Sequence, residues 1–146
     1  MPLAPWLEHL LLRATSAFID VGEGACPDPE SAGCPARLRG MVDHLPKDQV
    51  RLLHLGGRVV DLIAVLRFGR RFRSLDDGRA RRLLAGLADS RLRSVRRLHF
   101  VLKMTTQYAY FTGEATWKVT GFDGPWQPGP DVPVQPPPQL PSETGA

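Results

Sequence analysis

The chain has little of what membrane proteins and large enzymes need. Its 146 residues make one domain, but they leave no room for a cofactor-binding domain beside it. There is no run of about 18 apolar residues, so we expect no transmembrane helix. The first residues also lack the basic start and unbroken apolar stretch of a signal peptide, because Glu8 and Arg13 interrupt the apolar positions. We therefore expect a cytoplasmic protein.

Cysteine is almost absent. The two cysteines, Cys26 and Cys34, lie in one proline-rich stretch between helical patterns. A disulfide closing this short loop is sterically feasible, but a reducing cytoplasm favours two free thiols. No histidine lies nearby in the sequence, so the pair gives no indication of a metal site.

Residues that could do chemistry are present but are not arranged for it. The pair Gly56–Gly57 lacks the third glycine and the Lys-Ser/Thr of a phosphate loop. The four histidines fall on separate helical patterns without metal-ligand spacing. Ser94 and His99 point in different directions on a helix, so they make no triad with Asp89. We assign no catalytic, cofactor-binding or metal residue, and expect a protein that is not an enzyme.

Apolar residues recur at three- and four-residue steps, which predicts an all-α fold of about five helices. Gly22, Gly24 and several prolines interrupt this pattern and predict a long loop after the first helix. No alternating strand pattern occurs. Four of the predicted helices cover residues 5–19, 36–45, 47–68 and 92–111. Another predicted helix is capped by Ser74 and ends near residue 90, and a short helical turn is predicted at 114–119.

Residues 47–68 are apolar around most of the helix. The only polar stripe passes through Arg51, His54, Arg58 and Asp61, so we expect this helix to be the central one. The pair Gly56–Gly57 costs roughly 1 kcal/mol per residue in helix propensity. Close backbone approach to a neighbouring helix is the compensation that we expect.

The helix at 92–111 changes character along its length. Its first half is basic, whereas its second half is apolar nearly all round and is predicted to be buried. From Pro125 onward the sequence resembles extended polyproline. We therefore divide the chain into a helical accessory domain, residues 1–120, and a Gly/Pro-rich aromatic junction with a Pro-rich extended C-terminal tail, residues 121–146.

The net charge is +4, and arginines far outnumber aspartates between residues 67 and 97. Such a basic stretch has three interpretations: a solvated helix surface, a contact with an acidic protein, or a nucleic-acid surface. No nucleic-acid motif accompanies the arginines. A basic helical nucleic-acid-binding protein is therefore kept as the alternative function.

Aromatic residues are concentrated after the last long helix, where glycine and proline bend the chain. A small core cannot bury them all, and aromatic side chains are typical binding anchors. The other interpretation is that this segment folds back and caps the helices. The predicted partner interface consists of Tyr108, Tyr110, Phe111, Trp117, Phe122, Pro125 and Trp126, together with the basic pair Arg70 and Arg71.

Several of these segments together resemble a known helical module. They are residues 70–75, the helix at 80–92, Tyr108-Ala109-Tyr110-Phe111, and the stretch from Trp117 to the Gly-Phe-Asp-Gly-Pro ending at 125. The chain resembles the small-subunit family typified by gluconate 2-dehydrogenase subunit 3. It is also similar to the helical N-terminal region of long-chain alcohol oxidases of the glucose-methanol-choline (GMC) flavoenzyme group. The resemblance covers roughly residues 5 to 126.

This resemblance implies a heteromer. In such systems a large subunit, or the rest of a fused chain, carries FAD and the catalytic histidine that oxidise an alcohol or sugar hydroxyl. The present chain would be a non-catalytic small subunit that binds and stabilises this large flavoprotein, with no cofactor of its own. The Gly-Pro ending at residues 124–125 corresponds to the point where fused members continue into the flavin domain.

Overall fold

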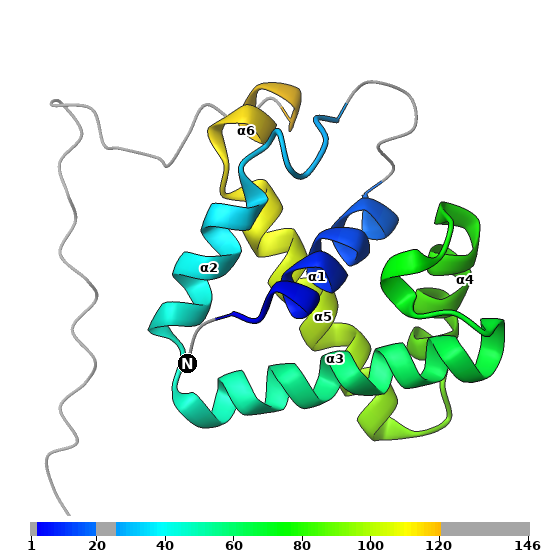
Figure 1. Ribbon diagram of the computed structural model, residues 1–146. Helices are drawn as coiled ribbons and strands as arrows, with labels where there is room; N and C mark the ends of the chain where they lie inside the picture. The colour runs from blue at the N-terminus through cyan, green and yellow to red at the C-terminus, as the bar shows by residue number, and fades with distance from the viewer. Residues whose placement is uncertain (1–2, 20–25, 121–146) are drawn as a thin grey trace, which may run out of the picture.

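The computed structural model describes residues 3–19 and 26–120. These residues form six α-helices and one short 3-10 helix, and no strand occurs among them, which confirms the all-α prediction (Figure 1). None of the helices in the described ranges has the length and apolarity of a membrane span. The elements are α1 (Pro5–Phe18), α2 (Cys34–His44), α3 (Lys47–Phe68), η2 (Phe72–Ser74), α4 (Asp77–Ala88), α5 (Arg93–Phe111) and α6 (Glu114–Thr120).

The helix at the centre of the fold is α1. It contacts α2, α3, η2, α4 and α5, and in Figure 1 it lies in front of α5 with the other elements around it. Leu7, Leu10, Leu11 and Ala14 have no exposed surface. Their spacing places apolar side chains on several sides of α1, so the helix can be covered from every direction.

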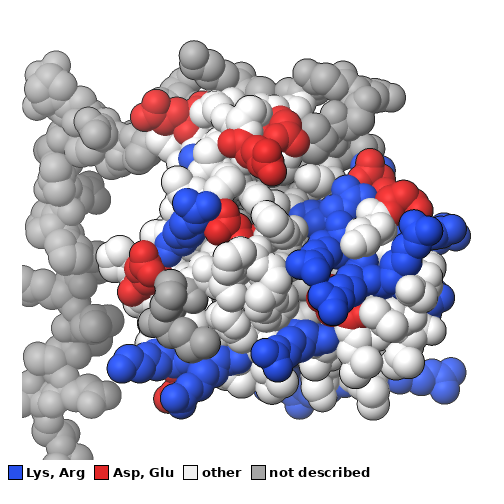
Figure 2. Space-filling view, viewed as in Figure 1, with Lys and Arg blue, Asp and Glu red and all other residues white. Residues whose placement is uncertain are grey.

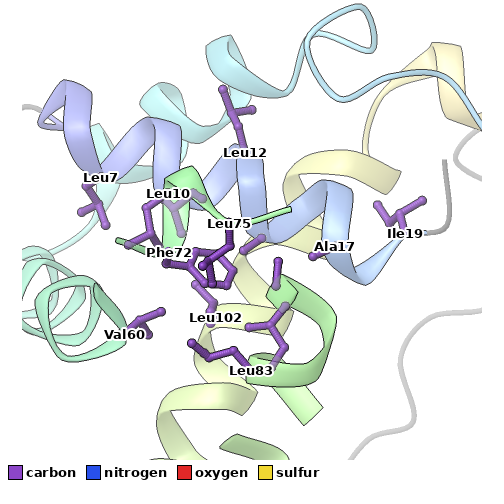
Figure 3. Packing of buried hydrophobic residues seen from close by; sticks show 14 of the residues in the cluster. Leu7, Leu10, Leu12, Ala17, Ile19, Val60, Phe72, Leu75, Leu83 and Leu102 are labelled. Carbon is purple, nitrogen blue, oxygen red and sulfur yellow. The ribbon is translucent and has the colours of Figure 1, made fainter. Parts of the chain in front are cut away.

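The core beneath α1 is closed by η2. Phe72 is fully buried and lies among leucines of α1 and α4 and Leu102 of α5 (Figure 3). The backbone N–H of Phe72 donates to Oδ1 of Asp61 at 2.9 Å, which fastens η2 to α3. Gly69, in the left-handed region at φ 70°, ends α3 and turns the chain towards this contact.

The N-cap of α4 is not the predicted Ser74. The N-cap is Asp76, whose carboxylate accepts from the N–H of Arg79 at 2.8 Å, whereas Ser74 lies in η2. This hydrogen bond is the main cause of the lowered pKa of Asp76. The cap is displaced because burial of Phe72 and Leu75 holds the residues before Asp76 outside the helix.

The prediction that residues 47–68 form the central helix is wrong. Within α3 only Val50, Gly57, Val60 and Ala64 are buried. Leucines on the other side are exposed, while Asp61, predicted in the polar stripe, is turned towards η2. The helix is apolar on two sides, and the side that contains glycine permits the closer contact with α1.

Close approach at the glycine pair is confirmed. A Cβ at Gly57 would lie 2.6 Å from Cδ1 of Leu7 and 3.1 Å from the Trp6 ring. A Cβ at Gly56 would lie 2.7 Å from Cδ1 of Leu98. The two glycines therefore let α3 pack against α1 and α5 at the same turn.

Replacing Gly57 with alanine tests this packing. We expect Gly57→Ala to lower the free energy of unfolding by about 1–3 kcal/mol, because Leu7 is fully buried and has little room to move. Gly40→Ala on α2 is the matched control, since a Cβ there meets nothing within 4 Å. It should raise stability by up to about 1 kcal/mol in urea unfolding. Equal effects of the two substitutions would contradict the close approach.

Two histidines are built into the packing. His54 lies edge-on to Trp6 at 5.7 Å, and His99 lies edge-on to Phe18 at 5.5 Å, measured between ring centroids. Burial lowers the pKa of both, assisted by Arg58 for His54 and Lys103 for His99. Nε2 of His54 is buried and has no hydrogen-bond partner among the described residues. The fold therefore favours both rings in the neutral form.

Stability should therefore depend on pH. Because both folded-state pKa values lie below the ordinary 6.5, the unfolded chain binds more protons, and stability is lost as pH falls from 6.5 through the folded pKa values. Chemical denaturation between about pH 5 and 8 measures this slope, above the range of the carboxylates. The double variant His54→Gln/His99→Gln should flatten it. An unchanged slope in that variant would assign the effect to other groups.

Candidate partner interface

The side of α5 that points away from the core is apolar. Phe100 and Tyr108 are 62% and 61% exposed, and Val101, Met104 and Phe111 are also exposed. Except for the adjacent pair 100–101, these five residues follow one another at steps of three or four positions. We call them the α5 outer face. The prediction that this half of the helix is buried holds for its inner side and is wrong for this face.

The reason lies in what covers α5. Leu102, Thr106, Ala109 and Tyr110 face the core, where α1, α2 and α4 contact the helix. No described element covers the opposite side, although it is equally apolar. Exposed apolar surface of this kind on one helix is characteristic of a binding site.

Tyr110 is a core residue, which corrects its place in the predicted interface. It is 1% exposed, and its hydroxyl donates to the carbonyl of Pro27 at 2.7 Å. Burial is the main cause that raises its pKa to about 12. The ring of Phe111 stands at 90° to that of Tyr110, with 5.2 Å between centroids. The buried tyrosine thus orients the exposed phenylalanine next to it.

Arg37 of α2 holds the same end of α5. Its Nε donates to the carbonyl of Ala109 at 2.6 Å, and its Nη2 donates to the carbonyl of Ala32. A side chain at Gly113 would collide with the Arg37 guanidinium. Arg37 therefore joins α2, the loop before it and the end of α5 at one point.

The two cysteines are free thiols, as predicted. Cys34 is buried at the first turn of α2, and its Sγ donates to the carbonyl of Ala109 at 3.5 Å. Burial raises the pKa of this thiol. Its role is packing next to Arg37, and the protonated form fits that role.

Trp117 lies on α6 and is partly exposed. Its indole Nε1 donates to the carbonyl of Phe111, the last residue of α5, at 2.9 Å. Thr116 donates to the carbonyl of Tyr110 at 3.0 Å. The described part of the aromatic segment therefore folds back on α5, which was the alternative interpretation, while Trp117 keeps an accessible edge. Phe122, Pro125 and Trp126 lie outside the described residues.

The structure does not bring Arg70 and Arg71 to the α5 outer face. Both are exposed in the connection between α3 and η2. In Figure 1 this connection lies near α4, whereas the aromatic end of α5 lies beside α6. The predicted interface is thus divided between an aromatic region and a separate basic region.

The basic region contains many exposed arginines. Figure 2 shows lysine and arginine side chains gathered on the side of the molecule where α4 lies. Some of these arginines bind groups that lie just before their own helix. Arg96 donates to the carbonyl of Ser90 at 2.7 Å, and Arg79 pairs with Asp76 at 3.3 Å. The exposed arginines of α4, of the connection after it and of the start of α5 are Arg79, Arg81, Arg82, Arg91, Arg93, Arg96 and Arg97.

The described residues contain no cluster of histidine, cysteine and carboxylate side chains that could hold a metal ion. An open cavity of about 580 Å³ is lined by polar residues, among them His9, Asp28 and Arg73, and by Leu12 and Pro29. Arg13, which also lines it, is bound to Asp77 and to the carbonyl of Leu75, both at 2.6 Å. The exposed apolar surface is therefore a stronger candidate site than this cavity.

Removing the Arg37 side chain tests what holds the aromatic end of α5. We expect Arg37→Met to lower the free energy of unfolding by about 1.5–3 kcal/mol, because it removes a charged donor from two carbonyls. Arg51→Met on α3 removes an exposed pair with Asp48 and should cost less than about 1 kcal/mol. Hydrogen exchange at residues 109–117 should rise only in the first variant. Equal exchange in both would contradict the anchoring role.

No family model, no curated protein and no solved structure matches this chain.

Proposed function

We propose that this chain is a non-catalytic subunit that binds a larger protein through the α5 outer face. The observation that carries the proposal is the exposure of Phe100, Met104, Tyr108 and Phe111 along one side of a helix whose other side is fully packed. Aromatic and methionine side chains are enriched in the centres of protein interfaces. A partner that covers this row removes large apolar side chains from water at little cost in ordering.

The surface also suggests the partner's chemistry. On the same side of α5, one to two turns before Phe100, the row of outward positions continues with Arg93 and Arg97, both exposed. An apolar groove with carboxylates at one end would match this arrangement. The aromatic residues would supply affinity, and the arginines would orient the encounter.

The partner that we propose is the FAD-carrying large subunit of a GMC-type oxidoreductase acting on an alcohol or sugar hydroxyl. The support is the sequence resemblance, which includes Tyr108 and Phe111 of the α5 outer face and Trp117 beside it. FAD would belong to the large subunit, and this chain would stabilise it as a heteromer. We place the complex in the cytoplasm, where the free thiols of Cys26 and Cys34 stay reduced.

Purification of the tagged full chain from its source cells tests the proposal. A large protein with the visible absorbance of a flavin should copurify with the unaltered chain. Phe100→Ala/Tyr108→Ala should weaken this binding by about a hundredfold, because two aromatic anchors are removed. Leu92→Ala is the matched control, since Leu92 is 66% exposed at the start of α5 but lies outside the row.

The outcomes separate the parts of the proposal. Capture of a partner without flavin would contradict the assignment to a GMC oxidoreductase but keep the interface. Unchanged capture by the double variant would contradict the interface itself. A large subunit that is soluble and fully active without this chain would contradict the stabilising role.

The alternative is nucleic-acid binding, which the exposed arginine group over α4 and the start of α5 favours (Figure 2). Phosphate contacts would make the affinity for duplex DNA fall steeply with salt. Arg81→Ala/Arg93→Ala/Arg97→Ala would then reduce this slope, and Phe100→Ala/Tyr108→Ala would leave it unchanged. Under the subunit proposal, DNA binding at physiological salt is negligible.

A further inference from the structure

A second apolar row lies on α3 and has a different character. Leu52, Leu55, Val59, Leu62 and Leu66 follow one another at alternating steps of three and four residues. Leu66 is 78% exposed, the other three leucines are between 58% and 66% exposed, and Val59 is half-buried. This spacing is that of the a and d positions of a coiled coil, which pack against another helix. We call these residues the α3 leucine row.

The α3 leucine row points away from the protein. Helical geometry places it opposite Val50, Gly57, Val60 and Ala64, the buried residues of the same helix. In Figure 1, α3 runs along the lower edge of the molecule and crosses in front of α5. Its contacts with α1, α5 and η2 are made through Gly57, Gly56 and Asp61. The row therefore has no covering element among the described residues.

Charges beside the row are almost all positive. Lys47, Arg51 and Arg58 are exposed along one border, and Arg67 is exposed on the other side. Of the two carboxylates of α3, Asp48 lies on this side and pairs with Arg51 at 3.4 Å, whereas Asp61 is turned towards η2. Figure 2 shows basic side chains along the lower part of the molecule, where α3 runs. A helix that packs on the row meets a basic border.

We propose that the α3 leucine row binds an amphipathic helix of a partner protein whose apolar seam is bordered by Glu and Asp. The apolar residues give helix-in-groove contact, and acidic borders pair with Arg51, Arg58 and Lys47. A second copy of this chain is disfavoured, because antiparallel pairing of two α3 helices sets the border of Lys47, Arg51 and Arg58 against itself. The row spans about four turns, which a short helix can cover.

The α3 leucine row is separate from the α5 outer face, because it lies on a different helix and has a different chemistry. Aromatic side chains are absent from the α3 leucine row, and its border charges lie alongside the seam instead of at one end. The two surfaces therefore can be removed separately by substitution.

Two synthetic helical peptides of about three heptads test the proposal with the full chain. Both carry leucine at the a and d positions, one with glutamate and the other with lysine at the e and g positions, and both are used below their self-association concentration. In fluorescence anisotropy the acidic peptide should bind at least tenfold more tightly than the basic one. Higher salt should reduce that difference.

Substitutions on α3 give the matched controls. Leu55→Gln/Leu62→Gln should abolish binding of the acidic peptide without loss of folding, because both leucines are more than half exposed. Arg51→Glu/Arg58→Glu should transfer the preference to the basic peptide. Phe100→Ala/Tyr108→Ala should bind the acidic peptide as the unaltered chain does. Circular dichroism and thermal unfolding verify that each variant is folded.

Two results would overturn the proposal. The first is a failure of the folded chain to bind the acidic peptide more tightly than the basic one. The second is a dimer in sedimentation that Leu55→Gln/Leu62→Gln dissociates, which would assign the row to a second copy. Capture of a flavin-containing partner through the α5 outer face is a separate readout, so failure here does not decide the proposed function.

Discussion

Burial of α1 is the constraint on which the rest of the structure depends. Leu7, Leu10 and Leu11 have no exposed surface, and every helix from α2 to α5 contacts α1. Because one short apolar helix occupies the centre, the two longer helices, α3 and α5, lie outside it and are covered on one side. Their remaining apolar side chains are left at the surface.

This arrangement explains why the protein carries more exposed apolar surface than its folding requires. The α5 outer face is aromatic and leads into arginines, whereas the α3 leucine row is aliphatic with basic borders. Large exposed apolar patches on a folded domain mark interaction sites. The two patches differ in chemistry, which is why the proposals assign a different partner element to each.

The end of α5 is fixed by hydrogen bonds within the protein. Tyr110 is anchored to Pro27, and Arg37 to Ala109, so segments far apart in the sequence meet beneath the α5 outer face. Fixing Phe111 and the turn into α6 in advance lowers the ordering cost of binding. The same contacts draw Trp117 back towards α5, which limits how much of the aromatic segment remains accessible.

Local patterns in the sequence determined the helices: α3 occupies the predicted 47–68, and the glycine pair marks its closest contacts. They also identified Tyr108 and Phe111, which are exposed, but missed Phe100 and Met104, whose four-residue spacing before Tyr108 was the available signal. Only the tertiary structure decided which side of α3 and α5 is buried. Periodicity cannot choose between two apolar sides of one helix, because that choice depends on contacts with residues distant in the chain, such as Leu7 against Gly57 and Pro27 against Tyr110.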